Sequence, residues 1–275
     1  KNLQNKLIQT NEPLVQDLLS SSNNLTFTIS NLRIIESCDI IFTLVATPSK
    51  ENGDYDVSSV WQVINDFKNT KANLRGKTFV VGSTVNPGDC NSFQGILSKL
   101  GINVLYNPEF IAQGSIINDL RNSDMVLIGG DEENFKDSNT FLFLKDLYSR
   151  IQRGYKKTQI KYMSTKAAEI AKLAVNCFLT TKISYANMLG EVLISSGLSS
   201  EINNVLDTVG THSPIGKSYL NYGFGYGGPC LPRDNRAFAD YSQKVGIKHN
   251  LGIVTDKINN EHSKFLLEFL IKDNS

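Results

Sequence analysis

The stretch from Lys166 to Gly197, KAAEIAKLAVNCFLTTKISYANMLGEVLISSG, decides how the chain divides. It contains no proline, and Gly197 stands where a helix commonly ends in a left-handed residue. The stretch predicts one helix of about thirty residues, roughly 45 Å long at about 1.5 Å per residue. Such a helix is too long to be covered by a domain of about 110 residues, and a two-fold partner is the commonest solution. We therefore expect a homodimer built on this helix.

Six short apolar runs precede this helix and alternate with amphipathic segments. Most of the runs are continuously apolar and rich in β-branched residues, which is typical of strands covered on both faces. The segments between them, for example Val57 to Lys68 and Asp89 to Leu100, are helical candidates. The pattern predicts an α/β fold with a mostly parallel sheet. The runs are LTFTIS, DIIFTLVATP, KTFVVGSTV, INVLYNPEF, SDMVLIGG and QIKYMST.

Beyond the long helix the sequence predicts further helices and one glycine-rich loop. A short helix runs from about Glu201 to Val209, with Ser199 or Ser200 as its expected N-cap. Another runs from about Asn235 to Val245, and a last one from about Leu251 to Ile271. The change from alternating runs to helices alone marks a domain boundary at the start of the long helix.

The overall composition is that of a soluble globular protein and argues against several classes of function. Of 275 residues, 40% are hydrophobic and 20% are charged, and the net charge of +1 gives no general attraction to nucleic acid or to a membrane surface. The four cysteines, at positions 38, 90, 177 and 230, show no close spacing that would indicate a zinc site or a disulfide framework. We therefore expect a protein of the reducing cytoplasm that holds no metal ion.

The segment from Tyr222 to Asp234, YGFGYGGPCLPRD, surrounds Cys230 with four glycines and two prolines. No helical or strand periodicity fits it, so we expect Cys230 in a tightly turned loop. Glycine permits positive φ and lets a ligand approach the main chain closely, whereas proline fixes φ. Taken alone, the segment is compatible with a surface loop that contains a cysteine or with a loop built around a reactive thiol.

Five motifs follow one another along the chain: DIIFTLVATPSKENGDYDVS, VGSTVNPGDC, YNPEFIAQGS, AAEIAKLAVNCFLTTKISYAN and GFGYGGPCLPRD. In this order they resemble the UDP-glucose/GDP-mannose dehydrogenase family, whose members use NAD to oxidise a nucleotide sugar to a uronate. The resemblance implies a Rossmann-like NAD-binding domain at residues 1–164, without the first βαβ unit and its GxGxxG turn. It further implies a central helical dimerisation and catalytic domain at residues 165–275, and a chain that lacks the family's C-terminal UDP-binding domain.

By this resemblance, four residues of the helical domain are expected to be catalytic. Cys230 matches the family's nucleophile, which captures an aldehyde as a thiohemiacetal that is then oxidised to a thioester. Lys172 and Asn176, spaced i,i+4, would stabilise the oxyanion; without that role they would form an ordinary solvated stripe. Asp234 would assist proton removal; its structural alternative is the N-cap of the helix that follows.

Residues that follow the predicted strands are expected to complete the site, because ligands of open α/β sheets bind at the carboxyl ends of strands. By the resemblance, Thr84 and Glu109 position the water that hydrolyses the thioester; alternatively they are a strand-end cap and a turn carboxylate. The expected NAD contacts are Thr47, Pro48, Ser83, Thr84, Gln113 and Arg233. The expected contacts of the UDP-sugar are Phe110, Lys172, Asn176, Tyr219, Asn221 and Gly227. The histidines at 212, 249 and 262 match no role and are expected at a surface or an interface.

The resemblance implies an NAD-dependent nucleotide-sugar 6-dehydrogenase that oxidises a UDP-hexose for polysaccharide synthesis. Pro214 stands where UDP-glucose enzymes of the family usually have arginine, so a UDP-N-acetylhexosamine or GDP-mannose also remains open as substrate. Two alternatives differ in kind. One is a two-electron hydroxyacid dehydrogenase, which needs no cysteine. The other is a truncated, inactive dimerisation module.

Overall fold

The computed structural model describes residues 3–131, 138–152 and 158–273. The chain forms two compact units. The first, here called the sheet unit, comprises Lys1–Pro48 and Asp56–Glu169. The second, the helical unit, comprises Ile170–Ser275 together with the short segment Ser49–Tyr55. The chain therefore passes from one unit to the other three times.

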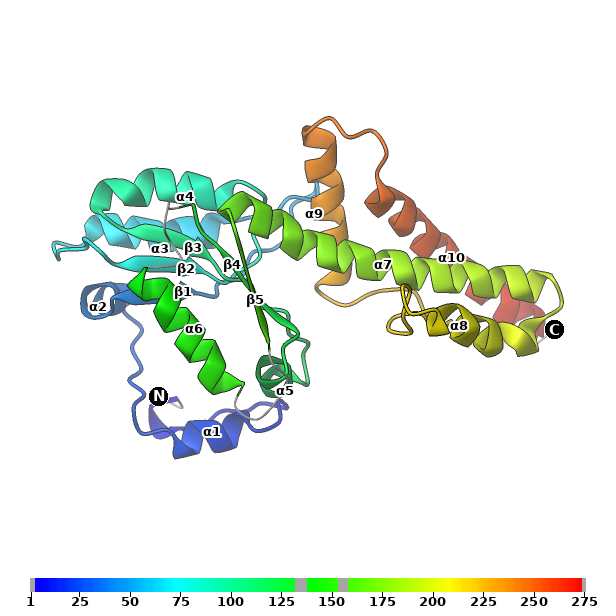
Figure 1. The fold of residues 1–275 in the computed structure, drawn as a ribbon, viewed down its shortest axis with the longest axis horizontal. Coiled ribbons are helices and arrows are strands. Elements are labelled where there is room, and N and C mark those ends of the chain that lie inside the picture. Colours follow the sequence, from blue (N-terminus) through cyan, green and yellow to red (C-terminus); the bar gives the residue numbers. More distant parts are fainter. Residues whose placement is uncertain (1–2, 132–137, 153–157, 274–275) are drawn as a thin grey trace. The chain divides into compact units, whose positions relative to one another are not determined.

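The sheet unit is built on five strands that lie in sequence order from β1 to β5 (Figure 1). The pairs β1–β2, β2–β3 and β4–β5 are parallel, and only β3–β4 is antiparallel. The prediction of an α/β fold with a mostly parallel sheet is confirmed. The strands are β1 (Ile40–Thr43), β2 (Thr78–Val81), β3 (Asn103–Tyr106), β4 (Met125–Gly129) and β5 (Gln159–Met163).

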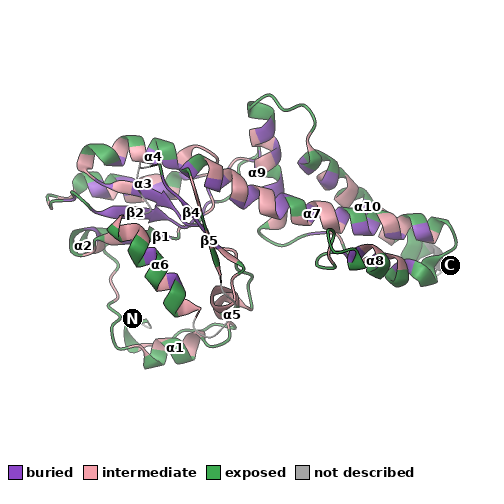
Figure 2. Cartoon of the chain, in the orientation of Figure 1, coloured by how far each residue is buried: buried purple, intermediate pink, exposed green. Residues whose placement is uncertain are grey.

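Helices cover both faces of the sheet, because successive side chains of a strand point to opposite faces. In β2, Phe79 makes an edge-to-face contact with Phe67 of α3 (Ser58–Asn69). Its neighbour Val80 instead packs with Leu144 of α6 (Asn139–Ile151). Every residue of β2 is buried, and Figure 2 shows this strand in purple. The shorter elements are η1 (Leu3–Asn5), α1 (Val15–Ser21), α2 (Asn31–Ser37), α4 (Asp89–Leu97), η2 (Ser98–Leu100) and α5 (Ile116–Arg121).

One predicted strand is absent: the segment LTFTIS has no regular structure. Its apolar side chains Leu25 and Ile29 are exposed. Its last residue, Ser30, instead caps α2 by accepting a hydrogen bond from the Arg33 backbone N–H. A β-branched composition favours a strand only where the backbone is paired and one face is covered. No described strand pairs with this segment.

The helical unit contains most of α7 (Thr165–Ser195), the long helix that the sequence predicted. Gly197 adopts φ +75°, and Leu198 donates its N–H to the Leu193 carbonyl at 2.8 Å, so the predicted glycine C-cap is present. The remaining elements are η4 (Ser199–Glu201), α8 (Ile202–Thr211), α9 (Leu231–Lys244) and α10 (Leu251–Asp273). None of the described helices is long and apolar enough to cross a membrane.

Two helix starts differ from the predictions. Ser199 and Ser200 lie within the 3₁₀ turn η4 and do not cap α8, whose N-cap position is Glu201 without a side-chain bond. Helix α9 begins at Leu231, so Asp234 lies inside its first turn and is not its N-cap. Pro232 explains the earlier start, because proline fits the first turn of a helix, where an N–H would have no partner.

Apolar and polar contacts both hold the helical unit together. An apolar cluster joins α7, α8 and the following loop through Ala186, Leu193, Leu206 and Leu220. Elsewhere Asn235 of α9, which is fully buried, accepts a hydrogen bond from Thr180 of α7 at 2.9 Å and donates to the Gly252 carbonyl of α10 at 2.8 Å. A buried amide that is bonded to two other helices fixes their register.

Candidate active site

Cys230 lies where the glycine-rich loop meets α9. It occupies the N-cap position of the helix, and its side chain is exposed, unlike those of Cys90 and Cys177. The partial positive charge at a helix N-terminus favours an anion at this place. At two positions of the loop, the structure shows why the residue is glycine. Gly228 has φ +74°, and a Cβ on Gly225 would lie 2.3 Å from the Asn259 Oδ1 atom.

Asp234 lies one turn after Cys230, and its backbone N–H donates to the Cys230 carbonyl at 2.9 Å. The side chain is only 1% exposed. The Tyr55 hydroxyl donates to Oδ1, and the Asn176 amide donates to Oδ2 at 2.5 Å. Both carboxylate oxygens therefore have a donor, and the carboxylate is fixed in orientation.

Lys172 and Asn176 lie on one face of α7, and both are buried. This excludes the alternative that they form a solvated stripe. The structure brings Asn176 into contact with Asp234, so two of the predicted catalytic residues of the helical domain meet directly. Lys172 lies one turn before Asn176 on the same face.

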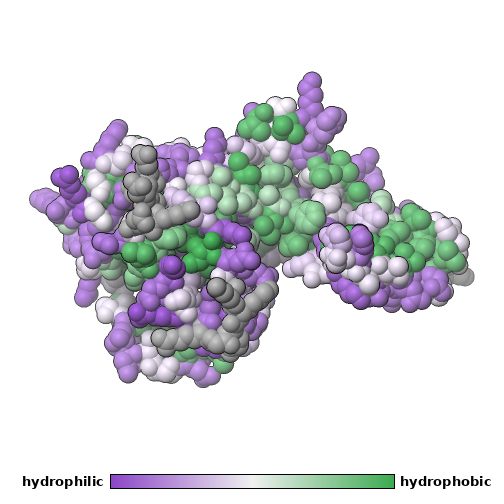
Figure 3. Space-filling model, in the orientation of Figure 1, coloured by the Kyte–Doolittle hydropathy of each residue, from purple (hydrophilic) through white to green (hydrophobic). Residues whose placement is uncertain are grey.

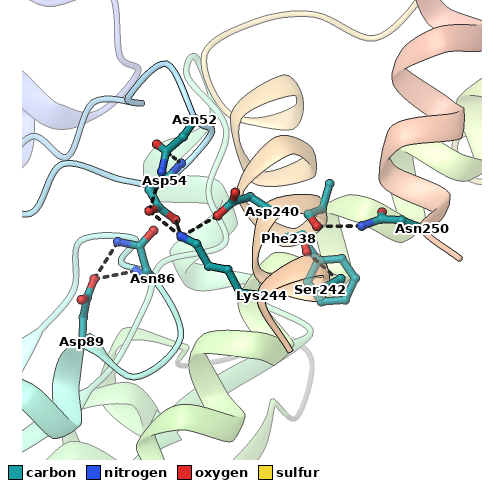
Figure 4. A network of polar contacts seen from close by, with 10 residues as sticks. Asn52, Asp54, Asn86, Asp89, Phe238, Asp240, Ser242, Lys244 and Asn250 are labelled. Carbon is teal, nitrogen blue, oxygen red and sulfur yellow. Dashed lines mark hydrogen bonds and ion pairs between the residues drawn. The ribbon is translucent and has the colours of Figure 1, made fainter. Parts of the chain in front are cut away.

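No spacing or period in the sequence indicates that Tyr55 belongs beside Asp234. It ends a small hairpin, Ser49–Tyr55, closed by an antiparallel bridge between its end residues. Asp54 of this hairpin is bonded to Lys244 of α9 at 2.6 Å, and Lys244 also pairs with Asp240 at 2.6 Å (Figure 4). Burial alone would raise the pKa of Asp54, but hydrogen bonds from Lys244 hold it below its ordinary value. The ion pair thus anchors the hairpin to α9.

The opposite end of the glycine loop is held by a second set of contacts. His262, expected at a surface or an interface, has a buried side chain within this unit. One ring nitrogen lies 2.6 Å from Glu191 Oε1 and the other 2.7 Å from the Gly223 carbonyl. Asn187 Oδ1 accepts the Gly223 N–H at 3.1 Å.

Four of the predicted NAD contacts, Thr47, Pro48, Ser83 and Thr84, follow the carboxyl ends of β1 and β2 in the sheet unit. The Thr47 hydroxyl donates to the Thr84 carbonyl at 2.8 Å, and the Ser83 hydroxyl donates to the Val45 carbonyl at 2.7 Å. These bonds tie together the two loops that follow adjacent parallel strands, which is where a dinucleotide binds in such sheets. The strand ends therefore fit the cofactor, although no GxGxxG turn follows a strand of this sequence.

Glu109 and Phe110 line a small cavity of the sheet unit together with Tyr148 of α6. Burial, and then the nearby charge of Glu109, raise the pKa of Tyr148 well above its ordinary value. Gln113 is exposed in the turn that follows. Within the described residues, no group of three histidine, cysteine or acidic side chains could hold a metal ion.

Three further predicted contacts of the sugar nucleotide, Tyr219, Asn221 and Gly227, belong to the helical unit. Tyr219 has φ +62°, a conformation that costs energy for a residue with a side chain. Asn221 lines a groove of about 250 Å³ together with Asp207 and Lys217. Gly227 is exposed in the glycine-rich loop.

Comparison with known proteins agrees with this geometry. Residues 1–152 match the model of the UDP-glucose/GDP-mannose dehydrogenase family's NAD binding domain, and residues 166–261 match the model of the family's central domain. The chain belongs to this family. A putative UDP-glucose 6-dehydrogenase of Bacillus subtilis is 32% identical over 238 residues, which are 85% of this chain and 53% of that protein. The UDP-glucose 6-dehydrogenase of Pseudomonas aeruginosa is 30% identical over 94% of this chain and 56% of its own length.

Solved structures of dehydrogenases share the fold. The UDP-glucose dehydrogenase of Pyrobaculum islandicum superposes with a TM-score of 0.85 at 26% identity, over 99% of this chain and 62% of that one. A UDP-D-ManNAc dehydrogenase from Pyrococcus horikoshii, at 23% identity, gives a TM-score of 0.75 over 96% of this chain and 61% of that one, and it shows the fold alone. The chain thus spans about half the length of the curated family members that it matches.

Proposed function

We propose that the protein containing this chain is an NAD-dependent nucleotide-sugar 6-dehydrogenase that converts a UDP-hexose to the UDP-uronate. One observation carries the proposal. An exposed cysteine at the start of α9 is followed one turn later by a buried carboxylate, whose oxygens are bonded to Asn176 of α7 and to Tyr55. The relatives named above as UDP-glucose 6-dehydrogenases support a UDP-hexose as substrate, and the product would serve polysaccharide synthesis.

The proposed roles follow from the chemistry of each side chain. Asp234 removes the proton of the reacting hydroxyl, and Lys172 and Asn176 donate to the oxyanion that develops on the substrate. Cys230 attacks the aldehyde carbon to give a thiohemiacetal, whose oxidation gives a thioester. Water positioned by Thr84 and Glu109 then attacks the thioester, which releases the uronate and returns the thiol.

Two oxidations at one carbon require two hydride acceptors, and NAD supplies this chemistry when it is bound. We propose that Thr47, Pro48, Ser83, Thr84, Gln113 and Arg233 hold the cofactor. The hydrogen bonds of Thr47 and Ser83 to main-chain carbonyls hold the two strand-end loops together. We therefore propose that these side chains maintain the shape of the protein surface that contacts the cofactor. Phe110, Tyr219, Asn221 and Gly227 are the proposed substrate contacts.

The central experiment is Cys230→Ser in the whole protein. A serine hydroxyl offers no anion at neutral pH, so uronate formation should fall by orders of magnitude from either the alcohol or the aldehyde. The wild type should form two NADH per sugar, and NAD affinity should be unchanged in the variant. Cys38→Ser, at a half-buried cysteine of the sheet unit, is the matched control.

Three results would contradict the proposal. Formation of one NADH per sugar by the wild type would instead indicate a two-electron dehydrogenase. Uronate formation by Cys230→Ser at the rate of Cys38→Ser would remove the thiol from the mechanism. If the wild type bound neither NAD nor a UDP-sugar, the alternative of an inactive dimerisation module would replace the proposal.

We also propose that α7 forms the centre of a homodimer. Four apolar residues of α7, spaced so that they share one face, are exposed: Phe178, Tyr185, Met188 and Val192. Apolar side chains gather over this helix in the space-filling view (Figure 3). An exposed apolar stripe on a helix is typical of a protein interface.

Light scattering tests this proposal. The wild type should be a dimer, and Met188→Glu should shift it toward monomer because the charge would be buried against the partner. Thr208→Glu, which adds the same charge to an exposed position on α8, should stay dimeric. A folded wild-type monomer at micromolar concentration would contradict the proposal.

A further inference from the structure

Tyr55 lies within the first motif, but neither the family resemblance nor the proposed mechanism gives it a role. It lies between β1 and α3 in sequence, 179 residues before Asp234. By its contacts, however, its hairpin is part of the helical unit. Three contacts hold the hairpin there: the bond of Tyr55 to Asp234, the Asp54–Lys244 pair, and the packing of Gly53 against the Arg236 backbone.

The surroundings of Tyr55 keep its hydroxyl a donor. The side chain is only 1% exposed, and burial, followed by the charge of Asp234, raises the Tyr55 pKa well above its ordinary value. The guanidinium of Arg233 lies over the Tyr55 ring at 5.3 Å from the centroid, a cation–π contact that fixes the ring's position. The hydroxyl proton therefore stays on Tyr55 across the working pH range and points to Asp234 Oδ1.

A carboxylate that acts as a base needs a fixed orientation and an ionised form. Asp234 takes both hydrogen bonds from side chains, one from Tyr55 and one from Asn176. Each donor stabilises the charged form of the carboxylate. Without Tyr55, Oδ1 would lose its partner in a buried place, and the carboxylate could rotate about its side-chain torsion toward other donors.

We infer that Tyr55 is a positioning residue of the dehydrogenase reaction, which holds the Asp234 carboxylate in the orientation that takes the substrate's proton. This inference rests on the proposed function, because it assigns Asp234 the role of base. It concerns one hydroxyl group that acts through Asp234 and does not itself touch the substrate.

The test is Tyr55→Phe in the whole protein, compared with Tyr162→Phe. The Tyr162 hydroxyl donates to the Gly130 carbonyl at 2.8 Å within the sheet unit, so its loss removes one partly buried hydrogen bond in which Asp234 takes no part. For Tyr55→Phe we expect kcat to fall about tenfold or more and the KM values for both substrates to change little. The acid limb of its kcat–pH profile should move to higher pH, since the charged carboxylate loses a donor.

A second substitution keeps the test decisive if Tyr55→Phe does not fold. Replacing Tyr55 by 3-fluorotyrosine retains the ring and the hydroxyl but makes the phenol a stronger donor. The acid limb should then move to lower pH, opposite to the shift in Tyr55→Phe. A purely structural role would change stability in both variants without opposite shifts of the pH profile.

The outcomes separate this inference from the proposed function. A wild type that forms no uronate would contradict the proposed function itself. An active wild type, together with a Tyr55→Phe variant whose kcat and pH profile match those of Tyr162→Phe, would overturn the role of Tyr55 and leave the proposed function standing. An unchanged profile in the 3-fluorotyrosine protein would overturn it as well.

Discussion

Two buried carboxylates of this chain, Asp234 and Glu169, are held in opposite ways. Asp234 lies in the first turn of α9 and takes its hydrogen bonds from the side chains of Tyr55 and Asn176. Glu169 lies in the first turns of α7, is fully buried, and accepts main-chain N–H groups from Gly88 at 2.5 Å and Cys90 at 2.8 Å. Those two groups belong to the start of α4, so Glu169 caps one helix from another.

Comparison of Asp234 with Glu169 shows that burial of a carboxylate does not by itself indicate a catalytic group. Burial raises the pKa of Glu169 to about 7 despite its two main-chain donors, a shift of the kind often taken to mark an active site. Yet its donors are backbone groups that no ligand can replace, and the adjacent Cys90 is buried, with a thiol pKa well above its ordinary value, first through burial and then through the Glu169 charge. Asp234 instead lies one turn from an exposed thiol.

The largest expected effect comes from neutralising each carboxylate in turn. Asp234→Asn keeps the side-chain shape but cannot take a proton, so kcat for uronate formation should fall by about 10² to 10⁴. Glu169→Gln should change kcat by less than about threefold, because the group acts only on the start of α4. Steady-state kinetics of the whole protein at saturating NAD measures both. Equal losses in the two variants would remove the distinction between the carboxylates.

The smaller effect concerns the stability of the chain as a function of pH. The Glu169 pKa rises from an ordinary 4.5 to about 7 on folding. The folded state therefore binds the proton more tightly than the unfolded state does. The contribution of Glu169 to stability is fully present below about pH 4.5 and is lost as the pH rises through about 7. This loss lowers the unfolding free energy by about 3 kcal/mol.

Urea denaturation at a series of pH values measures this contribution. In Glu169→Gln the decline of the unfolding free energy between about pH 4.5 and pH 7 should be smaller than in the wild type, since glutamine does not titrate. Asp234→Asn should retain the wild-type decline. The same slope in the wild type and in Glu169→Gln would show that Glu169 is not the group responsible.

Much of the fold could be predicted because its signals are local. Five of the six apolar runs form strands, and α7 matches its prediction within a residue at each end. The run LTFTIS does not form a strand. Whether a segment pairs with another strand, and whether another element covers its face, does not depend on its own residues alone. The predicted start of α9 at Asn235 is four residues late, because the glycines and prolines before it indicate a loop, whereas Pro232 is compatible with a first helical turn.

Only the site residues that lie in recognisable motifs could be predicted from the sequence. Cys230, Asp234, Lys172 and Asn176 were singled out by resemblance, and the structure adds the contact between Asn176 and Asp234. The partners of Glu169 lie about 80 residues upstream, and Tyr55 lies even farther from Asp234. Contacts at such separations depend on the whole fold and leave no local period or spacing in the sequence.

The hairpin Ser49–Tyr55 makes the helical unit discontinuous along the chain. A fragment cut before α7 would carry Asp234 and Asn176 but would lose the hydroxyl that completes the carboxylate's surroundings. A chimaera that takes only the residues from α7 onward from a relative would likewise keep the hairpin of the recipient protein. During synthesis the hairpin emerges from the ribosome more than a hundred residues before α9, with which it forms its contacts. It can therefore form these contacts only after α9 has been synthesised.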